Sequence, residues 1–555
     1  MIETDRGLFL FTFAALAAVF LILSPYKFLD GDDALQAIWA LCRQKGLAPY
    51  PFPLHGFESR SGTFLLIYLF SFIAGSPLLA YGILCALASA LSLSILLLYS
   101  NELLGTIPKP VHLAVLAGLT PEIIYAGLYP NAAIIGYCFG FLSLYLSLRF
   151  LKKDKNSPYF VLSGMLFGTA LLCSASSAYL ALAFPLQHLF LKKQRKLADV
   201  MIRFGYEVGC GGLFYFLALR AMGLPPLAAL TEFSEVTGGY AGADIKYTII
   251  TLLGALNPWT AAILPVAFVL LLRKKAFLPL TVGLFTAPVY FIMVRNLVKS
   301  FQHGLAVYLL VCISGVIIWE MLGKKSLCAA YFALLVLPLF LGLRLYLPEQ
   351  PHRGPGFSEI DTGQGLTLDQ KDQRGLSGYV IWQSSKYILA GRGIRLVLGS
   401  GFMLPSVDGG RALGGHFWVW VKDWRDYLDY TNKSADTALK GGDQDIVMGQ
   451  YAVGAIALYK LVERGYLPAH FKSDHEYFFQ KNGKIIRTYW YFNELAEQLD
   501  KKSLNFGKLA SRIDRGIFVA FPSYAYKLEN GSLAIDGYSA EALGCFCFKI
   551  TKNRL

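Results

Sequence analysis

The chain has 555 residues, of which 55% are hydrophobic and only 16% are charged. A soluble globular protein carries about 25% charged residues, so this composition excludes that class and indicates an integral membrane protein. The formal net charge of +14 lies largely in short basic clusters between apolar runs, where it reports membrane orientation. We therefore expect no nucleic-acid partner.

Hydrophobic runs recur along the first part of the chain and stop near residue 345. A helix needs about 20 apolar residues to cross roughly 30 Å of hydrocarbon. Apolar length and polar breaks together predict about eleven crossings. They are expected at residues 8–24, 77–98, 111–125, 132–150, 159–173, 178–191, 206–219, 259–272, 277–294, 305–319 and 326–345. The first run lacks a small-residue cleavage pattern, so we expect an uncleaved signal anchor.

An acidic cluster, Asp30, Asp32 and Asp33, follows the first run in the stretch FLDGDDALQAIW. The segment that begins there has helical periodicity, and the apolar segment 62–75 is too short to span comfortably. Both are predicted to be helices that lie along the membrane surface. Asp32 and Asp33 would open the first helix, where acidic residues also cap the amino terminus and complement its dipole. Capping alone accounts for one or two of these residues.

A second carboxylate, Glu122, is expected at the outer end of the third run, in LTPEIIYAGLYPNAAIIG. An ionised group beside a membrane span is costly unless it is wet or paired, which makes a functional role the default hypothesis. Cations are expected on the same face. Taken singly, each is explained as an anchor for a helix end; as a set beside carboxylates, they suit a phosphate. They are Arg60, Arg220, Lys246, Arg295, Lys299 and His303.

Basic clusters set the orientation. The groups at 152–155, 192–196, 273–275 and 324–325 all fall on one side of the predicted membrane domain. That side is cytoplasmic by the positive-inside rule. The acidic loop and the carboxyl-terminal tail are then outside.

The tail has a different composition. From Pro348 it is rich in Gly, Asp, Gln and Lys, which predicts a flexible connector. Beyond the connector, GHFWVWV alternates like a strand and DIVMGQYAVGAIALYKLVERG is predicted to be an amphipathic helix. The pairs Asn482-Gly483 and Asn530-Gly531 predict hairpin turns. The predicted organisation is a membrane domain at 1–346, a linker at 347–376 and a mixed α/β extracytoplasmic domain at 377–555.

Two outer-face carboxylates beside a surface helix suit a substrate whose reactive end lies at the headgroup level, such as a lipid-linked phosphosugar. Phosphate is a good leaving group, so displacement at the sugar carbon needs one carboxylate to accept the acceptor's proton. Cations must also stabilise the departing phosphate. Carboxylates near phosphate are compatible with Mg²⁺ or Mn²⁺, but they do not by themselves establish a metal site.

The long acidic first loop, the PFPL and SGTFLLIYLFSFIAGSPLLAYG pattern and the TPEIIYAGLYPNAAI segment resemble the GT-C class of integral-membrane glycosyltransferases, in particular its protein mannosyltransferase and lipid A aminoarabinose transferase branch. The resemblance covers roughly the first 345 residues. It implies transfer of a sugar from a polyprenyl phosphate on the outer side of the membrane. It also implies that Asp32 is catalytic with Asp33 as its neighbour, that Glu122 matches a recurring acidic position, and that His303 lies near the lipid phosphate.

The resulting hypothesis is an inverting glycosyltransferase of the plasma or inner membrane. Asp32 activates a glycan, lipid or protein acceptor. Asp33 and Glu122 shape the site or hold a cation, and the basic residues receive the polyprenyl phosphate. One alternative is a secondary transporter or lipid flippase, although such proteins usually place charges near the bilayer midplane and show repeated halves. Another is a noncatalytic assembly protein, for which a single anchor would suffice.

Overall fold

The computed structural model describes a set of segments that includes most of the first 227 residues and most of the chain after residue 431. They are residues 2–28, 31–47, 60–104, 126–153, 159–191, 197–227, 231, 269, 343–346, 395–398, 412–413, 432–440, 445–449, 451–473, 476–491, 503–520, 528–529, 532–544 and 547–553. The predicted crossing at 111–125 lies outside them. The predicted crossings beyond residue 231 also lie almost entirely outside these segments.

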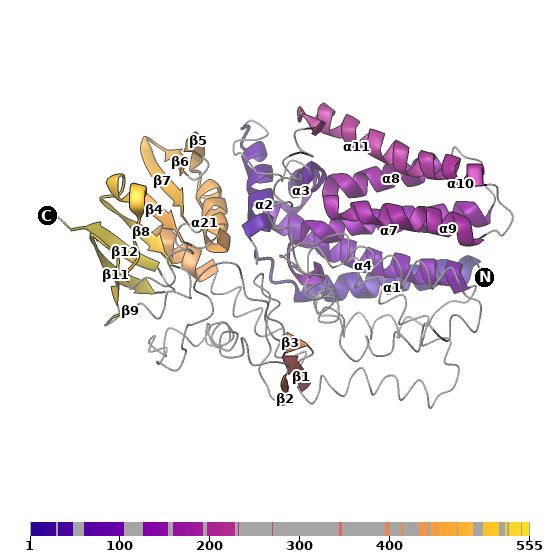
Figure 1. The fold of residues 1–555 in the computed structure, drawn as a ribbon, viewed down its shortest axis with the longest axis horizontal. Helices are drawn as coiled ribbons and strands as arrows, with labels where there is room; N and C mark the ends of the chain where they lie inside the picture. The colour runs from indigo at the N-terminus through magenta and orange to yellow at the C-terminus, as the bar shows by residue number, and fades with distance from the viewer. Residues whose placement is uncertain are drawn as a thin grey trace.

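The amino-terminal half is a bundle of helices that run side by side, with shorter helices across one end (Figure 1). The helices are α1 (Ile2–Leu23), α2 (Gly31–Gln44), α3 (Ser61–Ala74), α4 (Pro77–Leu104), α7 (Ala132–Lys152), α8 (Tyr159–Cys173), α9 (Ala183–Leu191), α10 (Leu197–Phe204) and α11 (Cys210–Ala221). The predicted crossings within the described segments therefore coincide with helices. Two boundaries differ, because a 3₁₀ turn at Ala175–Leu182 precedes α9 and a π turn at Gly205–Gly209 joins α10 to α11.

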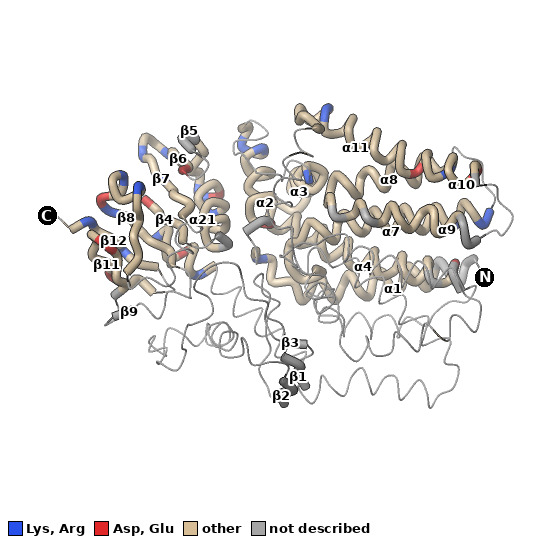
Figure 2. Tube along the Cα trace, viewed as in Figure 1, with Lys and Arg blue, Asp and Glu red and all other residues tan. Residues whose placement is uncertain are grey.

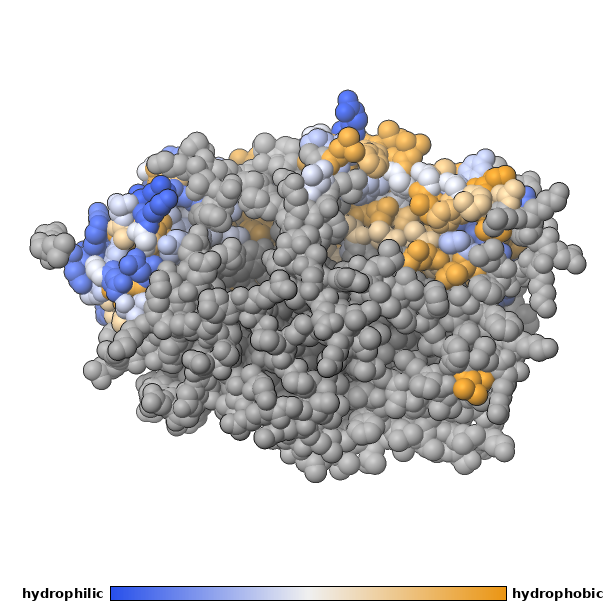
Figure 3. All heavy atoms as spheres, in the orientation of Figure 1, coloured by the Kyte–Doolittle hydropathy of each residue, from blue (hydrophilic) through white to orange (hydrophobic). Residues whose placement is uncertain are grey.

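The outer surface of the bundle is apolar. Phe11 on α1 is 71% exposed, Ile73 on α3 is 80% exposed and Leu213 on α11 is 60% exposed. The space-filling view shows such side chains gathered over the bundle and hydrophilic ones over the carboxyl-terminal sheet (Figure 3). A large apolar patch of this kind would be a liability in water and suits lipid. Among the described helices, α4 and α7 are long and apolar enough to cross a membrane by length and composition; the count of about eleven crossings stays a prediction.

The segment that begins at the acidic cluster forms the predicted helix, α2, which lies across the end of the bundle (Figure 1) but is not exposed. Every residue from Asp33 to Cys42 is buried. One side of α2 packs on α3, where the rings of Trp39 and Phe64 stack with centroids 5.2 Å apart, and Gln44 Nε2 donates to Ser71 Oγ at 2.6 Å. The other side packs on a helix from the carboxyl-terminal domain, which the sequence pattern did not predict.

The carboxyl-terminal domain is a seven-stranded mixed sheet in the order β11-β12-β8-β4-β7-β6-β5. Its central strand, β4, pairs in parallel with both β7 and β8. The strands are β4 (Asp445–Met448), β5 (Leu467–Ser473), β6 (Glu476–Lys481), β7 (Lys484–Trp490), β8 (Arg515–Val519), β11 (Tyr538–Gly544) and β12 (Cys547–Lys552), with helix α21 (Tyr451–Glu463) after β4 and a 3₁₀ turn (Gly507–Ser511) before β8. The prediction of a mixed α/β domain is confirmed.

Several local predictions for the tail can be checked. The hairpin at Asn482-Gly483 is confirmed, with both residues at positive φ (50° and 78°) between β6 and β7. Strands β9 (Leu528–Glu529) and β10 (Ser532–Leu533) pair antiparallel around the second predicted turn. The prediction of one helix over DIVMGQYAVGAIALYKLVERG was wrong at its start, because DIVM forms the buried strand β4. A short apolar run does not distinguish a buried strand from a helix.

A second, three-stranded sheet joins distant parts of the chain. Strand β1 (Leu343–Tyr346) pairs with β2 (Arg395–Leu398) and β3 (Ala412–Leu413). Residues 343–345, expected at the end of the last membrane helix, are therefore extended. Backbone pairing with two segments from the tail overrides the helical preference of an apolar sequence.

The helical bundle and the carboxyl-terminal domain meet where α21 covers α2. The rings of Phe28 and Tyr459 contact edge to face with centroids 4.9 Å apart, and both side chains are almost fully buried, at 1% and 2% exposure. Asn432 Nδ2 donates to the carbonyl oxygen of Phe28 at 3.2 Å. Burial raises the pKa of the Tyr459 phenol, so this side chain stays neutral in the interface.

We expect Tyr459→Leu to loosen this junction. An edge-to-face aromatic pair contributes about 1 kcal/mol beyond the area it buries, which corresponds to a Tm decrease of a few degrees. Thermal unfolding of the purified full chain in detergent measures the change. Tyr206→Leu is the matched control, since Tyr206 is 37% exposed and its loss should leave Tm unchanged. An equal decrease in both variants would contradict the interface argument.

Candidate functional site

The site forms at the end of the bundle that α2 crosses. Asp33 lies in the first turn of α2 and is only 2% exposed. Its Oδ1 accepts a hydrogen bond of 2.7 Å from the hydroxyl of Tyr81, a fully buried residue near the start of α4. A carboxylate in such a place needs hydrogen-bond donors to offset its lost hydration. The Asp33–Tyr81 bond therefore ties the start of α2 to α4.

Two amide side chains adjoin this pair. Gln36, one turn after Asp32 on α2, places Oε1 3.2 Å from the Tyr81 hydroxyl. Cys85, one turn after Tyr81 on α4, is bonded to the backbone of Asn131: its sulfur lies 3.3 Å from the Asn131 carbonyl oxygen and 3.1 Å from the Asn131 nitrogen. Asn131 in turn caps α7, with Oδ1 accepting from the backbone nitrogen of Ala133 at 2.9 Å. These contacts connect α2, α4 and α7.

Of the two predicted cations that the structure describes, Arg60 and Arg220, Arg60 lies near this place. It immediately precedes α3 and is partly buried. The charges of Asp33 and Arg60 both act on the Tyr81 hydroxyl, so the acidic and basic predictions share one neighbourhood. The start of α3 is fixed by Thr63, whose Oγ1 donates to the carbonyl oxygen of Cys173 at 3.0 Å.

Arg220 lies at the same end of the bundle but is not part of this cluster. It occupies the last turn of α11 and is exposed. Its neighbour Leu219 packs in one small core with Leu172, next to the Cys173 that anchors α3. The tube view shows that one end of α11 lies toward α2 and α3 (Figure 2). The position of Arg220 suits an anchor in the lipid headgroups as well as a contact with a phosphate.

Other predicted site residues are not settled by the structure. Asp32 belongs to α2 by its backbone, and its side chain lies outside the described part. Glu122, Lys246, Arg295, Lys299 and His303, as well as Asp30, lie outside the described segments. Within the described part, no group of three or more His, Cys, Asp or Glu is placed to bind a metal ion. A divalent cation and the roles of these residues stay predictions.

Sequence reasoning missed Tyr81, Gln36, Cys85 and Asn131. Tyr81 and Cys85 lie within an apolar run, LLAYGILCAL, where a single polar atom does not change the average hydropathy. Asn131 had a usable signal, because it follows Pro130 and directly precedes a predicted helix, which is the pattern of an N-cap. Gln36 also had a usable sequence signal, because it stands four residues after Asp32 and so lies on the same side of the helix.

Cys42, further along α2, is buried at 0% exposure. Burial raises the pKa of its thiol to about 12, against a smaller lowering by Lys45. The thiol is therefore protonated at neutral pH and serves as a small apolar side chain in the core, not as a nucleophile.

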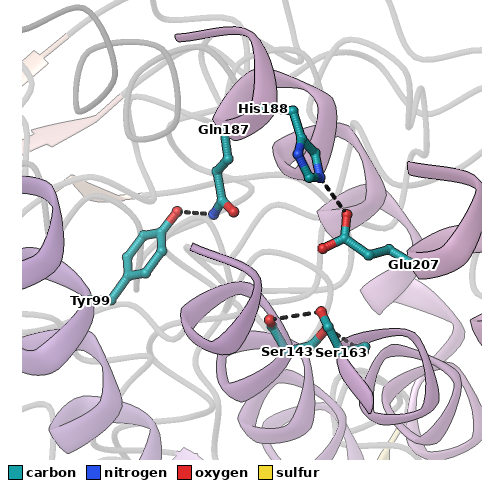
Figure 4. A network of polar contacts seen from close by, with 6 residues as sticks. All are labelled: Tyr99, Ser143, Ser163, Gln187, His188 and Glu207. Carbon is teal, nitrogen blue, oxygen red and sulfur yellow. Dashed lines mark hydrogen bonds and ion pairs between the residues drawn. The ribbon is translucent and has the colours of Figure 1, made fainter. Parts of the chain in front are cut away.

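A second polar cluster lies within the bundle, away from this site (Figure 4). His188 Nε2 and Glu207 Oε2 are 2.8 Å apart and both side chains are completely buried. Ser143 donates to the Ser163 carbonyl oxygen at 2.6 Å. Glu207 lies in the π turn, where a Cβ at Gly164 would come within 2.7 Å of its carbonyl oxygen. Close approach of α8 to this wide turn thus requires a glycine at position 164.

We expect Tyr81→Phe to slow the reaction of this site with little effect on substrate binding, because Tyr81 positions Asp33 and its helix. Loss of one hydrogen bond to a charged group corresponds to about 1.5–3 kcal/mol, or roughly 10-fold to 100-fold in rate. The decrease should appear in kcat with KM nearly unchanged. Tyr99→Phe is the matched control, since Tyr99 is another buried tyrosine of α4 that bonds Gln187 instead. A larger effect of Tyr99→Phe would contradict the assignment.

Comparisons with known proteins bear on the fold that carries this site. Residues 62–217 match the sequence model of the dolichyl-phosphate-mannose-protein mannosyltransferase family. The whole chain superposes on the crystal structure of ArnT from Cupriavidus metallidurans in the apo state, with a TM-score of 0.53, 13% identity and 98% of each chain covered. The same protein bound to undecaprenyl phosphate gives a TM-score of 0.51, 11% identity and 97% coverage of each chain. The chain thus shares the fold of ArnT, and its residues 62–217 are similar to the mannosyltransferase family.

The match confirms the resemblance inferred from the sequence motifs, and no curated protein matches the chain significantly by sequence. Because the superposition covers both halves, the GT-C fold here comprises a polytopic membrane domain and a carboxyl-terminal domain rich in β-strands. The family match runs from α3 to α11 and includes Tyr81 and Asn131, whereas α2 with its aspartates precedes it.

Proposed function

We propose that this GT-C enzyme transfers a sugar from a polyprenyl-phosphate donor to an acceptor on the extracytoplasmic side of the membrane, with inversion at the sugar carbon. The observation that carries the proposal is the buried Asp33–Tyr81 hydrogen bond, which fixes the acidic start of α2 beside Arg60. The undecaprenyl phosphate bound by the structurally similar ArnT supports a carrier of this class, and the mannosyltransferase family supports a sugar cargo.

Asp32 is the general base of the proposed reaction. It takes a proton from the acceptor's hydroxyl or amine as that group attacks the anomeric carbon, and the polyprenyl phosphate leaves from the opposite face. Asp33, held by Tyr81, fixes the turn that carries Asp32. Arg60 stabilises the charge that develops on the phosphate, since a preorganised cation near a leaving group lowers the barrier. We expect Glu122 to supply a second carboxylate, and Lys246, Arg295, Lys299 and His303 to supply further cations for the phosphate.

The side of the membrane follows from charge. The amino terminus and the end of α7, which carries Lys152 and Lys153, lie at the end of the bundle opposite α2 (Figures 1 and 2). Lys152 pairs there with Glu102 at 3.1 Å. Short basic loops favour the cytoplasm. The site and the carboxyl-terminal domain are then extracytoplasmic.

The test is sided transfer in proteoliposomes. Purified full-length protein is given undecaprenyl phosphate bearing labelled mannose or labelled aminoarabinose, together with an envelope extract from a strain that lacks the protein. We expect labelled product with inverted anomeric configuration, formed only when acceptor is on the α2 side. Folded protein that consumes neither donor would refute the proposed function.

A transporter is the second candidate, because the buried His188–Glu207 pair lies within the bundle, where transporters place charged side chains. The same proteoliposomes distinguish the two functions. Transport would move labelled donor across the membrane without forming any covalent product.

A further inference from the structure

Two buried amide groups beside Asp33 and Tyr81 have hydrogen-bonding capacity that the described residues do not use. Gln36 and Asn131 are each only 1% exposed. Gln36 Nε2 and Asn131 Nδ2 are buried without a hydrogen-bond partner among the described residues. Leaving a buried polar group unpaired costs free energy, so such a group in a native protein indicates an absent ligand or water.

The Asn131 amide has a definite orientation. Its Oδ1 accepts from the backbone nitrogen of Ala133 at 2.9 Å as the cap of α7, and an amide nitrogen could not replace that acceptor. The NH₂ group is therefore the unpaired end, and it offers donors. The backbone of Asn131 is fixed as well, by its two contacts with Cys85.

The Gln36 amide has one unpaired end in either orientation. Tyr81 has a single hydroxyl proton, and its shorter bond, 2.7 Å to Asp33, uses that proton. One end of the Gln36 amide thus contacts Tyr81, and the other end has no partner. The end without a partner is the NH₂ donor in one amide orientation and the oxygen acceptor in the other. A ligand group that both donates and accepts satisfies it in both cases, and a hydroxyl is such a group.

The two amides approach one short stretch of α4 through contacts with two residues that share a face of the helix. Gln36 contacts Tyr81, and Asn131 contacts Cys85, four residues or about 6 Å further along the helix axis. The charge of Asp33 acts on Cys85 as well as on Tyr81, so the whole set is compact. Gln36 is also four residues after Asp32, which places the two on the same side of α2.

We propose that Gln36 and Asn131 recognise hydroxyl groups of the transferred sugar, and so determine which polyprenyl-linked sugar the enzyme accepts. The proposal rests on the proposed function, since it names the substrate contacts of that same site. A sugar fits these groups because it presents several hydroxyls around one ring, each able to pair with an amide. The lipid phosphate is a poorer match for Gln36, because Gln36 and the negatively charged Asp33 both contact the Tyr81 hydroxyl.

Binding is tested apart from transfer. Full-length protein is heated with undecaprenyl phosphate, and with undecaprenyl phosphate bearing mannose or aminoarabinose. The difference in Tm between the sugar-bearing and sugar-free carrier measures the contribution of the sugar. We expect a positive difference for the wild type with at least one sugar, and its loss in Gln36→Met and in Asn131→Ser, which retains a capping oxygen for α7.

Gln187→Met is the matched control, because Gln187 is also a buried glutamine bonded to a tyrosine of α4, far from this site. It should retain the sugar-dependent Tm difference. Persistence of that difference in Gln36→Met and Asn131→Ser, or its absence from the wild type with both sugars, would overturn the proposal and point to ordered water at the amides.

Transfer kinetics provide the second measurement. We expect each of the two variants to lower kcat/KM for the preferred donor by about 10-fold or more, mainly through KM. Donors that each lack one sugar hydroxyl should show which amide binds which hydroxyl. The wild type should use such a deoxy donor poorly if an amide binds the missing hydroxyl. The variant that lacks that amide should use the deoxy donor and the parent donor equally well. Unchanged discrimination in both variants would overturn the proposal while the glycosyltransferase function stands. A sugar-dependent Tm difference without any transfer would refute the function and leave the recognition in place.

Discussion

Replacement of Asp32 by Asn is expected to reduce sugar transfer by about 10²-fold to 10⁴-fold, the usual contribution of a positioned general base. Asparagine retains the size and N-terminal capping capacity of aspartate, so the start of α2 should form normally. The carboxamide cannot accept the acceptor's proton. The loss should therefore appear in kcat, whereas binding of undecaprenyl phosphate should persist.

Two comparisons make this result specific. Asp199→Asn changes an exposed carboxylate of α10 at the other end of the bundle and should leave transfer unchanged. Asp33→Asn should have a smaller kinetic effect than Asp32→Asn, because Asp33 acts through its bond with Tyr81. If Asp33→Asn proved the more damaging change, the base would be Asp33 and the assignment would move by one residue. Undiminished transfer by both variants would remove the aspartates from the mechanism.

Replacement of Glu207 by Leu is expected to be the most destabilising change in the described bundle. It leaves His188 completely buried and without its 2.8 Å partner, and breaking a buried pair costs about 3–5 kcal/mol. The expected decrease in Tm is about 6 °C or more. Thermal unfolding in detergent, with Glu207→Gln as the control that can still hydrogen-bond, measures it.

The double variant Glu207→Leu with His188→Leu separates two contributions to stability. One is the free energy of the intact pair, and the other is the penalty for leaving His188 buried without a partner. The double variant removes both partners, so much of the lost stability should return. Equal Tm values for Glu207→Leu and the wild type would show that the pair carries no structural role. A normal Tm with lost activity would instead favour the transporter hypothesis, in which this pair contacts the moving substrate.

The agreement between sequence and structure is best where one physical effect dominates. Residues 159–173 were predicted from apolar length and form α8 over that same range. The Asn482-Gly483 turn was predicted from its tolerance of positive φ and adopts it. The strand β4 was missed because four apolar residues satisfy both a helix and a buried strand, and only its parallel pairing with β7 and β8 decides between them.

The sequence by itself determined the membrane class, the position of the helices in the described bundle, the acidic start of α2 and the GT-C resemblance. These features depend on composition and on local periodicity, which are properties of contiguous residues. Only the tertiary structure decided that α2 is enclosed between α3 and α21, that Asp33 bonds Tyr81 in the neighbourhood of Arg60, and that Gln36 and Asn131 lie near them. Contacts of this kind join residues far apart in the chain, and the pattern of hydrophobicity along a single segment carries no information about its partners.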